Sequence, residues 1–461
     1  MVGLIAASFM MMAVMSPIVT ENASAATTST SYKYLVYPSG STYYVKNANG
    51  AVVYSSTNAA SAIQKAIDSL TSGRTTKETV LLQGTFTLTK AIQMRSYTIL
   101  QLSGKITMGT NSNTHMATAS GISNFEIVGG EWNANQAAQS LGGVERRALD
   151  FASCKYATIK NLKVHDAAYG NVVFYKSSYI TISNVETYNA GNKARGSAWL
   201  GHGIFMYACN NCVVENCNIH DTAAGGCYFY TENDKVVQTI NNNVMRGNLV
   251  QRTQTSGLSI SLRGTEDKGV GNLIEKNTII DSGIDGVHYG INLGYGVPGM
   301  FADKCTVRNN VVYETGKYYS GTGVGGGIVA ICHNSLITKN IVHDTTDVGI
   351  CVRGTYNTIS YNDVDVVRNK YYPGIQIVDG SRNKVLYNTV SNCVNGISVH
   401  ISKTSGSSYN QIAYNTIENI AQYVVSIANP GSTGNIIEYN KFVGNHAIGN
   451  KGTGTIIRGN T

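Results

Sequence analysis

Most of the side chains suited to chemistry lie in the middle of the sequence, near the stretch from Gly203 to Asn292. They bring together phenols, imidazoles, carboxylates and a guanidinium group, the types that transfer protons and bind acidic ligands. The residues that we assign to catalysis are Tyr230, His288, Arg263, His202, His220 and Asp221. The residues that we assign to substrate binding are Tyr207, Tyr228, Glu232, Asp285, Asn292 and Arg353.

This set of residue types predicts proton abstraction from an acidic sugar. Arg263 would neutralise a carboxylate, and Tyr230 or His288 would remove or return the proton. Each residue also has a structural explanation. Exposed tyrosines can reflect β propensity alone, and Arg263 can be an ordinary surface charge. His–Asp dipeptides before strands are typical of turns, in which the aspartate accepts backbone N–H groups. The turns that carry Asp166 and Asp344 are therefore only the second candidate site.

An asparagine recurs in a short phrase of apolar residues almost to the end of the chain, and successive copies are 22 to 33 residues apart. A repeat of this size is typical of a solenoid, in which each unit buries its apolar face by stacking on its neighbours. With a β-rich composition, it predicts an all-β, single-stranded right-handed parallel β-helix. We expect the asparagines to stack at a bend, without a chemical role. They are Asn161, Asn184, Asn216, Asn248, Asn277, Asn310, Asn340, Asn362, Asn388, Asn415 and Asn440.

A glycine followed by alternating side chains predicts the register of one strand in each coil. Residues one and three positions after the glycine should face the core, and those two and four positions after it should face outward. With coils about 4.8 Å apart, the outward residues would form columns on one face, where we place the active site. The inward set includes Ile204, Leu258, Val287, Tyr289, Ile350 and Ile397. The outward set includes Tyr207, Tyr228, Tyr230, Ser259, Ser261, His288 and Cys351.

The composition suits a protein with many tight turns and a polar surface. There are 49 Gly and 5 Pro, and charged residues make up 13% of the chain. The net charge is +8, but no run of Lys and Arg occurs, so nucleic acid is not an expected partner. An acidic polysaccharide partner would explain the positive surplus, and so would general solubility. We expect a monomer.

Three segments are expected along the chain. Residues 1–20 are apolar and Ala23-Ser24-Ala25 fits a cleavage site, which predicts a signal peptide over residues 1–25, although a basic start is missing. Residues 26–78 contain a hairpin around Asn49-Gly50 and an N-terminal capping helix that would cover the open end of the core. Residues 79–461 form the coils. No later segment is apolar and long enough to cross a membrane, so we expect a secreted or cell-surface protein.

The nine cysteines are an odd number. Cys154 and Cys209 each lie seven residues before a repeat asparagine, which predicts equivalent positions in two coils. Cys209 and Cys212 form a CxxC motif, but no second pair follows at the spacing of a zinc finger. We expect buried free thiols, with a disulfide or a metal site as the alternative.

The order of a capping helix, GTFTL, GGEWNAN and asparagine-ladder coils resembles the pectate-lyase-like superfamily of right-handed β-helix proteins, over residues 59–460. Its members include pectate lyases, polygalacturonases, alginate lyases and mannuronan C5-epimerases. Gly201-His202-Gly203 is similar to the GHG of polygalacturonases, but their paired aspartates and Arg-x-Lys strand are absent. The Asp-Pro-His motif of the epimerases is also absent. The resemblance thus implies the fold and leaves the reaction open.

These observations favour an exported enzyme that acts on a uronate-containing polysaccharide by β-elimination or C5 epimerisation. Both reactions begin by removing the proton beside a neutralised carboxylate. A glycoside hydrolase of polygalacturonase type is one alternative, although inverting hydrolysis needs two carboxylates about 6.5–9.5 Å apart. A non-catalytic carbohydrate-binding or cell-surface β-helix is the other. No cofactor is predicted with certainty, and Ca²⁺ is the ion that such a site could use.

Overall fold

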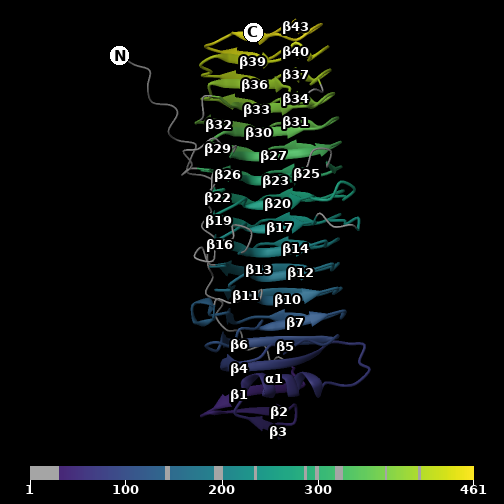
Figure 1. Cartoon of the computed structure of the whole chain (residues 1–461), viewed down its shortest axis with the longest axis vertical. Coiled ribbons are helices and arrows are strands. Elements are labelled where there is room, and N and C mark those ends of the chain that lie inside the picture. The colour runs from purple at the N-terminus through teal and green to yellow at the C-terminus, as the bar shows by residue number, and fades with distance from the viewer. Residues whose placement is uncertain are drawn as a thin grey trace, which may run out of the picture.

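The computed structural model describes residues 31–140, 146–191, 201–232, 236–284, 288–295, 301–316, 325–368, 371–402 and 406–461. The expected signal peptide lies outside these residues. Within them, the chain winds into a right-handed parallel β-helix whose coils stack along the long axis of the molecule (Figure 1). The fold class expected from the repeat is confirmed.

Each central coil gives one strand to a 15-stranded sheet, which we call sheet B. Its strands pair in parallel from one coil to the next, except that the short β24 (Ala302–Asp303) pairs only with β27. The other strands of sheet B are β5 (Ile92–Gln93), β7 (Ala117–Ser120), β10 (Arg147–Ala152), β12 (Gly170–Tyr175), β14 (His202–Tyr207), β17 (Cys227–Tyr230), β20 (Leu258–Ser261), β23 (Tyr289–Tyr295), β27 (Gly326–His333), β30 (Val348–Arg353), β33 (Pro373–Val378), β36 (Asn395–His400), β39 (Tyr423–Ile427) and β42 (Ile448–Asn450).

The rest of each coil belongs to a 28-stranded sheet, which we call sheet A. In most coils it contributes two short strands separated by a bend. The strands before the bend are β8 (Glu126–Val128), β15 (Val213–Glu215), β18 (Val244–Arg246), β21 (Leu273–Glu275), β25 (Thr306–Arg308), β28 (Leu336–Thr338), β31 (Thr358–Ser360), β34 (Lys384–Leu386), β37 (Gln411–Ala413), β40 (Ile436–Glu438) and β43 (Ile456–Arg458). The strands after the bend are β9 (Glu131–Asn133), β16 (Asn218–Thr222), β19 (Leu249–Thr253), β22 (Thr278–Ser282), β26 (Val311–Tyr313), β29 (Ile341–Thr345), β32 (Asp363–Val367), β35 (Thr389–Ser391), β38 (Thr416–Glu418) and β41 (Lys441–Val443). Four longer strands run through the bend: β4 (Glu78–Leu88), β6 (Thr98–Met108), β11 (Thr158–His165) and β13 (Thr181–Tyr188).

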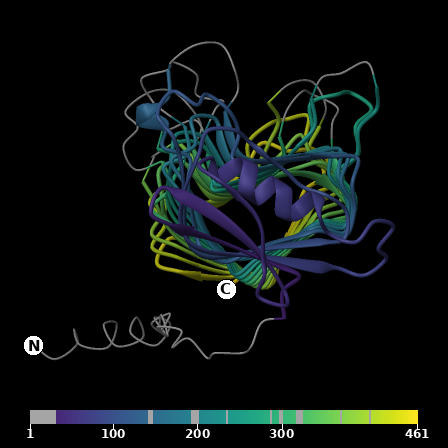
Figure 2. The same cartoon turned by 90° about the horizontal axis from the view of Figure 1, so that it is seen from below.

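The N-terminal end of the core is covered by helix α1 (Ala59–Asp68), which lies across the coils when the molecule is seen from below (Figure 2). The side chain of Asn58 caps the helix by accepting the N–H of Ser61, and its alanine and isoleucine face is buried. The strands β1 (Tyr34–Ser39), β2 (Thr42–Asn47) and β3 (Val52–Ser56) form an antiparallel meander. Because β1 also pairs in parallel with β4, this entry segment is continuous with sheet A. A short 3-10 helix, η1 (Gln136–Ala138), follows β9.

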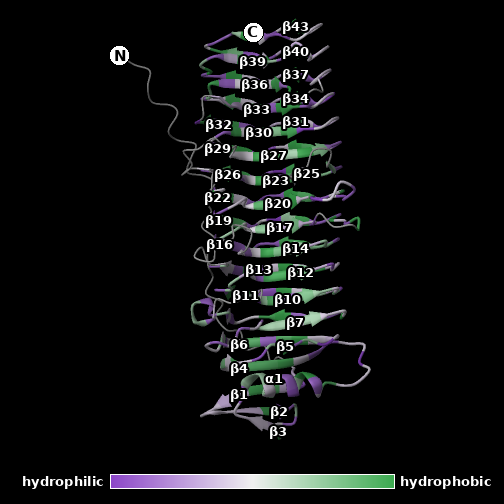
Figure 3. Cartoon of the chain, in the orientation of Figure 1, coloured by the Kyte–Doolittle hydropathy of each residue, from purple (hydrophilic) through white to green (hydrophobic). Residues whose placement is uncertain are grey.

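The core is built by the inward positions that the glycine phrase predicts. Ile204, Leu258, Ile350 and Ile397 are all buried, which confirms the register at these coils. Hydrophobic and hydrophilic residues are interleaved along the strands of the coils (Figure 3), as expected when alternate side chains face the core. Cys351 faces outward as predicted, but it is covered by a small apolar cluster on the outer face of sheet B.

The glycine of the phrase has a steric cause. A Cβ on Gly349 would lie 2.4 Å from Cγ1 of Val364 and 2.6 Å from the carbonyl oxygen of Gly374. The glycine near the start of the sheet B strand therefore lies too close to the core of its own coil to carry a side chain. It also lies too close to the backbone of the next coil.

At the coil of β23 this glycine is Gly290 and not Gly286. A Cβ on Gly290 would lie 2.4 Å from Cγ1 of Val312, the same contact as in the neighbouring coils. Ile291 and Leu293 therefore fill the core. The inward prediction is wrong for Tyr289, which packs against the apolar cluster on the outer face, and Val287 lies outside the described residues.

The asparagine ladder is present, but it begins later than predicted. From Asn248 to Asn460, each ladder asparagine accepts hydrogen bonds from the backbone N–H and side-chain amide of the preceding one. Asn277, Asn340 and Asn388 are therefore stacked as expected.

Asn216 is not in this ladder. It lies one position earlier, in a left-handed conformation with φ 53°, and Cys217 occupies the ladder position. Asn161 and Asn184 share that earlier column, where asparagine tolerates positive φ better than most residues.

A second ladder, which the sequence analysis missed, runs along the bend that follows sheet B. Asn357, Asn383, Asn410 and Asn435 are joined by the same type of bond, from each backbone N–H to the next amide oxygen. Ser335 continues this column by donating its N–H to Asn357.

All nine cysteines are free and buried. Cys154 and Cys209 occupy equivalent positions, because the register joins β10, β12 and β14 without a shift. Burial raises the pKa of Cys154 to about 11 and that of Cys217 to about 12. The prediction that Cys154 and Cys209 are buried free thiols is confirmed.

Candidate functional site

Tyr230 and Arg263 meet on the outer face of sheet B. The guanidinium carbon of Arg263 lies 5.9 Å from the ring centroid of Tyr230, within the range of a cation–π contact. The backbone N–H of Arg263 donates to Oγ1 of Thr231 at 2.9 Å, which holds the two chain segments together. Both side chains are half-buried. This part of the predicted site is assembled by the fold.

The phenol of Tyr230 is a proton donor near neutral pH. Burial raises its pKa above the usual 10, Arg263 lowers it, and the nearby carboxylate of Glu232 raises it further. A tyrosine of this kind keeps its proton until alkaline pH. The raised pKa favours donation of a proton, and the role of Tyr230 as the base stays a prediction.

A second arginine–tyrosine group, absent from our sequence assignment, lies on the same face. The guanidinium carbon of Arg147 is 4.6 Å from the ring centroid of Tyr175 and 4.9 Å from that of Tyr169. Arg147 also donates to Oδ1 of Asp150 at 3.0 Å. Burial raises the pKa of Tyr175, although Arg147 opposes the rise. Because Arg147 is buried, we interpret it as a group that positions Tyr175.

Rings connect the two groups across neighbouring coils. The centroid of Tyr207 lies 5.4 Å from that of Tyr175 and 6.5 Å from that of Tyr230. The register places these three residues in one column of sheet B. The glycine phrase does not identify Tyr175, because Gly170 pairs with His202 and Asn171 takes the place of Gly203. Arg147 has no sequence signal either, because its strand does not carry the glycine phrase.

Tyr207 and Tyr228 lie in the floor of this face and not on its surface. Only 7% of Tyr207 and 6% of Tyr228 is exposed. The hydroxyl of Tyr207 accepts from Nε2 of Gln238, and that of Tyr228 bonds Oγ1 of Thr255 at 2.9 Å and accepts the N–H of Ser256. We expected both tyrosines to be exposed, and that expectation is wrong. Their hydroxyls bind the protein itself.

His202 is also buried, at 6% exposure. Its Nδ1 accepts the backbone N–H of Gly225 at 3.1 Å, and its ring packs 4.9 Å from Phe205 and 4.5 Å from Tyr228. These contacts fix the turn before sheet B. The GHG motif therefore has a structural role, and the assignment of His202 to catalysis is not supported by its position.

The register shift at β23 changes the position of two predicted residues. His288 precedes β23 and is not in the outward column beside Ser259. Asn292 takes that place and is buried, donating to Oγ of Ser259 at 2.9 Å and of Ser261 at 3.3 Å. The placement predicted for His288 is thus wrong, and Asn292 bonds to its own sheet. Asp285 lies outside the described residues.

His220 and Asp221 belong to sheet A, before the turn that leads into sheet B. Nδ1 of His220 lies 2.6 Å from Oδ2 of Asp221, and Nε of Arg252 lies 2.6 Å from Oδ1 of the same carboxylate. Hydrogen bonds from Arg252 lower the pKa of Asp221 to about 2. Asp221 has φ 53°, as expected for the turn explanation. The prediction that this pair joins Tyr230 is wrong, because the two groups lie at opposite ends of β17.

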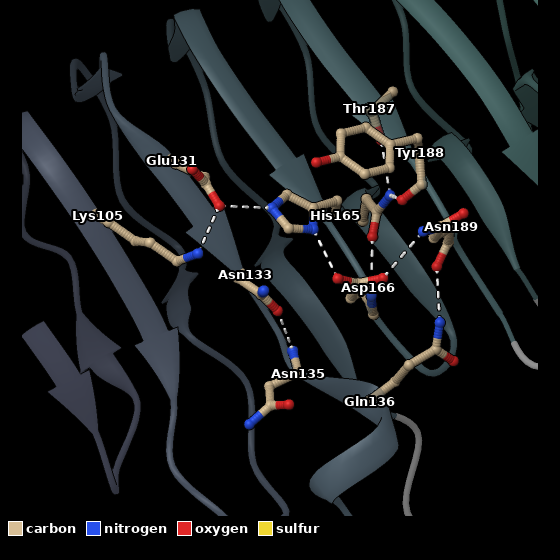
Figure 4. Close-up of polar contacts among 12 residues, drawn as sticks. Lys105, Glu131, Asn133, Asn135, Gln136, His165, Asp166, Thr187, Tyr188 and Asn189 are labelled. Atoms are coloured by element: carbon tan, nitrogen blue, oxygen red, sulfur yellow. Dashed lines mark hydrogen bonds and ion pairs between the residues drawn. The ribbon is translucent and has the colours of Figure 1, made fainter.

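His220 continues a stack of rings along sheet A. The centroids of His165 and Tyr188 are 4.5 Å apart, those of Tyr188 and His220 are 5.1 Å apart, and the planes are nearly parallel. His165 lies between Oδ2 of Asp166 at 2.7 Å and Oε1 of Glu131 at 3.1 Å (Figure 4). Each ring covers the face of the next, so the stack stabilises the packing of the coils. Only the edges of the rings are accessible to a ligand.

Glu232 and Arg353 have different surroundings. Glu232 is exposed at the end of β17, where its charge raises the pKa of both Tyr230 and Tyr175. Arg353 ends β30, which lies three strands beyond β20 in sheet B, or about 14 Å along the axis. Glu232 therefore belongs to the candidate site, and Arg353 does not. We call Tyr175, Tyr230, Glu232 and Arg263 the catalytic face, because they are the candidates for catalysis.

Among the described residues, no group of three or more His, Cys, Asp or Glu side chains could hold a metal ion. In the same part of the chain, no helix has the length and apolar character needed to span a membrane.

Comparison with known proteins identifies the family and the fold. The family model for the right-handed beta helix region matches residues 115–267, 147–331, 266–412 and 301–461. No curated protein sequence matches the chain. The surface adhesin PfbA of Streptococcus pneumoniae is similar in structure, with a TM-score of 0.52 at 14% identity over 80% of this chain and 88% of that one.

Two enzyme structures are also similar at lower scores. The A-module of the mannuronan C-5 epimerase AlgE6 of Azotobacter vinelandii has a TM-score of 0.44 at 13% identity, over 88% of this chain and 95% of that one. The exopolygalacturonase of Thermotoga maritima has a TM-score of 0.47 at 12% identity, over 84% of this chain and 87% of that one. At these identities the likeness concerns the fold alone.

Proposed function

The chain belongs to the right-handed β-helix family, and we propose that it is an enzyme that acts on a uronate-containing polysaccharide. The proposed reaction removes the proton beside the uronate carboxylate. The observation that carries the proposal is the placing of Arg263 over the ring of Tyr230, with Glu232 beside it, on the outer face of sheet B. A cation, a proton donor and a proton acceptor thus lie together at the ends of the neighbouring strands β17 and β20.

Arg263 has the chemistry to neutralise the substrate carboxylate. A guanidinium group can form two parallel hydrogen bonds to a carboxylate, which fixes its orientation as well as its charge. Withdrawing charge from the carboxylate makes the proton on the adjacent C5 carbon easier to remove. The half-buried position of Arg263 strengthens this interaction, because less water screens it.

Glu232 and Tyr230 then divide the proton transfers. Glu232 accepts the C5 proton, and Tyr230, whose pKa is raised, donates its own. In β-elimination, the C5 electron pair forms the C4–C5 double bond, the bond from C4 to the glycosidic oxygen breaks, and that oxygen takes the proton of Tyr230. In C5 epimerisation, a proton returns to the opposite face of C5. Both reactions share the first step.

Hydrolysis is the weaker alternative on this face. Glycoside hydrolysis needs one carboxylic acid that holds a proton and one carboxylate. Asp150 is a second carboxylate among the described residues of this face, and it accepts a hydrogen bond from Arg147 and lies 3.7 Å from Nε2 of His115. The carboxylate of Asp150 is thus already engaged by side chains of the protein itself.

The test is incubation with a panel of uronate polysaccharides, followed by absorbance of unsaturated ends, reducing-end assay and analysis of C5 configuration. Unsaturated ends indicate a lyase, and changed configuration with unchanged chain length indicates an epimerase. Arg263→Ala, Glu232→Gln and Tyr230→Phe should each lower the rate about 10²–10⁴-fold. Arg252→Ala, on sheet A, is the matched control and should keep full activity. Reducing ends without unsaturation, or no change on any polymer, would contradict the proposal.

A further inference from the structure

The outer face of sheet B continues beyond the catalytic face into two adjoining hollows. One, of about 320 Å³, lies over β27, β30 and β33, and the other, of about 700 Å³, lies over the strands from β33 to β42. Tyr372, Gln376 and His400 line both hollows. The two hollows therefore form one groove along the axis of the solenoid, which we call the distal groove.

The floor of the distal groove is low because the outward side chains are small. The register places Ser398, Ser426 and Gly449 in one column of neighbouring strands. Oγ of Ser426 donates to Oγ of Ser398 at 3.1 Å, which leaves a short hydroxylated surface. In the catalytic half of the sheet, the same column holds Phe205 and Tyr228. Small side chains in this column therefore leave room for the hollow.

Tyrosines form the rim of this groove. Tyr371 is 75% exposed and Tyr423 is 45% exposed, although both line the larger hollow. The ring of Tyr423 lies over Gly449, where a Cβ would come within 3.1 Å of it. Tyr372 packs against the apolar cluster on the outer face and so has a fixed position. Exposed rings beside hydroxyl and amide groups suit sugars, which present both apolar faces and hydroxyls.

The charges that line the groove are of one sign. Arg353 lines the smaller hollow and Lys451 the larger, and His400 lies between them. None of the described residues that line either hollow is acidic, although the chain contains 27 Asp and Glu. A groove with this selection of charges is complementary to a polyanion.

We propose that the distal groove binds a second stretch of the same acidic polysaccharide, held while another part of the polymer occupies the catalytic face. This inference rests on the proposed function. The two regions share one unbroken sheet face, and six strand steps separate β17 from β36, or roughly 29 Å. Only a polymer long enough to span that distance can use both, so the distal groove favours long chains over short oligosaccharides.

The experiment compares long and short substrates with groove variants of the full chain. The double variant Tyr371→Ala/Tyr423→Ala should bind fluorescently labelled polyuronate about five- to tenfold more weakly. Its KM on the polymer should rise by the same factor, with kcat unchanged. Its KM on oligosaccharides too short to reach the groove should not change. Tyr414→Ala is the matched control, because Tyr414 has the same 45% exposure but lies on sheet A.

A second variant tests the positive charge of the groove. Lys451→Gln should weaken binding of the polyuronate and leave binding of a neutral β-glucan unchanged. Equal binding by wild type and both groove variants would overturn the inference while the proposed function stood. Equal losses on long and short substrates, or on neutral and acidic polymers, would also overturn it. If wild type neither bound nor altered any polyuronate, the proposed function itself would fail.

Discussion

Replacing one ladder asparagine tests how the coils are held together. The side chain of Asn362 takes part in four buried hydrogen bonds. Its amide nitrogen donates to the carbonyl of Ile337 and to Oδ1 of Asn388, both at 2.9 Å. Its oxygen accepts the backbone N–H of Asn340 at 3.0 Å and the side-chain amide of Asn340 at 2.9 Å. Asn362→Ala removes all of these bonds at once.

The expected loss of stability follows from that count. At about 1 kcal/mol for each bond, Asn362→Ala should lower the free energy of unfolding by about 4 kcal/mol. The backbone N–H of Asn340 and the carbonyl of Ile337 each lose a buried partner, which acts in the same direction. Oδ1 of Asn388 still accepts the backbone N–H of residue 362. Residue 362 is 1% exposed, so water does not reach the vacated space readily.

The assay is urea unfolding followed by circular dichroism, with Asn184→Gly as the matched control. Asn184 donates a single exposed hydrogen bond to Asn161 and has φ 53°, which glycine adopts without strain. The control should change stability by less than about 0.5 kcal/mol. A solenoid can unfold in more than one step, so the transition of the coils around β32 must be read separately if two appear. A loss below about 1 kcal/mol for Asn362→Ala would refute the reasoning.

Three further outcomes are expected. The rate on polyuronate should stay high through neutral pH and fall only above about pH 10, because Tyr230 must hold its proton and its pKa is raised; a rate that climbs through pH 10 would make Tyr230 the base. Tyr228→Phe should cost about 1–2 kcal/mol of stability through loss of the bonds to Thr255 and Ser256 but keep activity, whereas Tyr230→Phe should do the reverse. The stabilising effect of Asp221, measured against Asp221→Asn, should be complete above its unfolded pKa near 3.8 and vanish as pH falls through about 2, because its folded pKa is the lower one; an effect that persisted below pH 2 would contradict the pairing with Arg252.

The inward-facing residues of most coils could be predicted from the sequence, because the core packing of a solenoid repeats from coil to coil. Ile204, Ile350 and Ile397 follow their glycines at one fixed offset, and each meets the same neighbours one coil away. The one error of register arose where two glycines, Gly286 and Gly290, both fit the phrase. Only the close approach to Val312 decides between them, and that contact joins sheet B to a strand of sheet A later in the chain.

The ladder shows a similar limit. KNLKV and KNTII look alike as sequences, yet Asn161 lies in the left-handed column and Asn277 lies one position later, in the ladder. In KNTII the positive φ of that column falls on Lys276, whereas in KNLKV it falls on Asn161 itself. Such a slip of one residue depends on the neighbouring coils and is not visible within a single copy of the repeat.

The outward half of the coils was harder to predict, because burial there depends on side chains from other coils. Tyr207, Tyr228 and Tyr230 all face outward in one register, but only Tyr230 keeps an accessible ring. The hydroxyl of Tyr207 is covered by Gln238, which lies in the segment between β17 and β18, and that of Tyr228 by Thr255 of the next turn. The fold therefore repeats its backbone while its outer columns change from large rings to serines along the axis. Those columns, and not the backbone, distinguish the surface around Tyr230 from the surface around Ser398 and Ser426 on the same sheet.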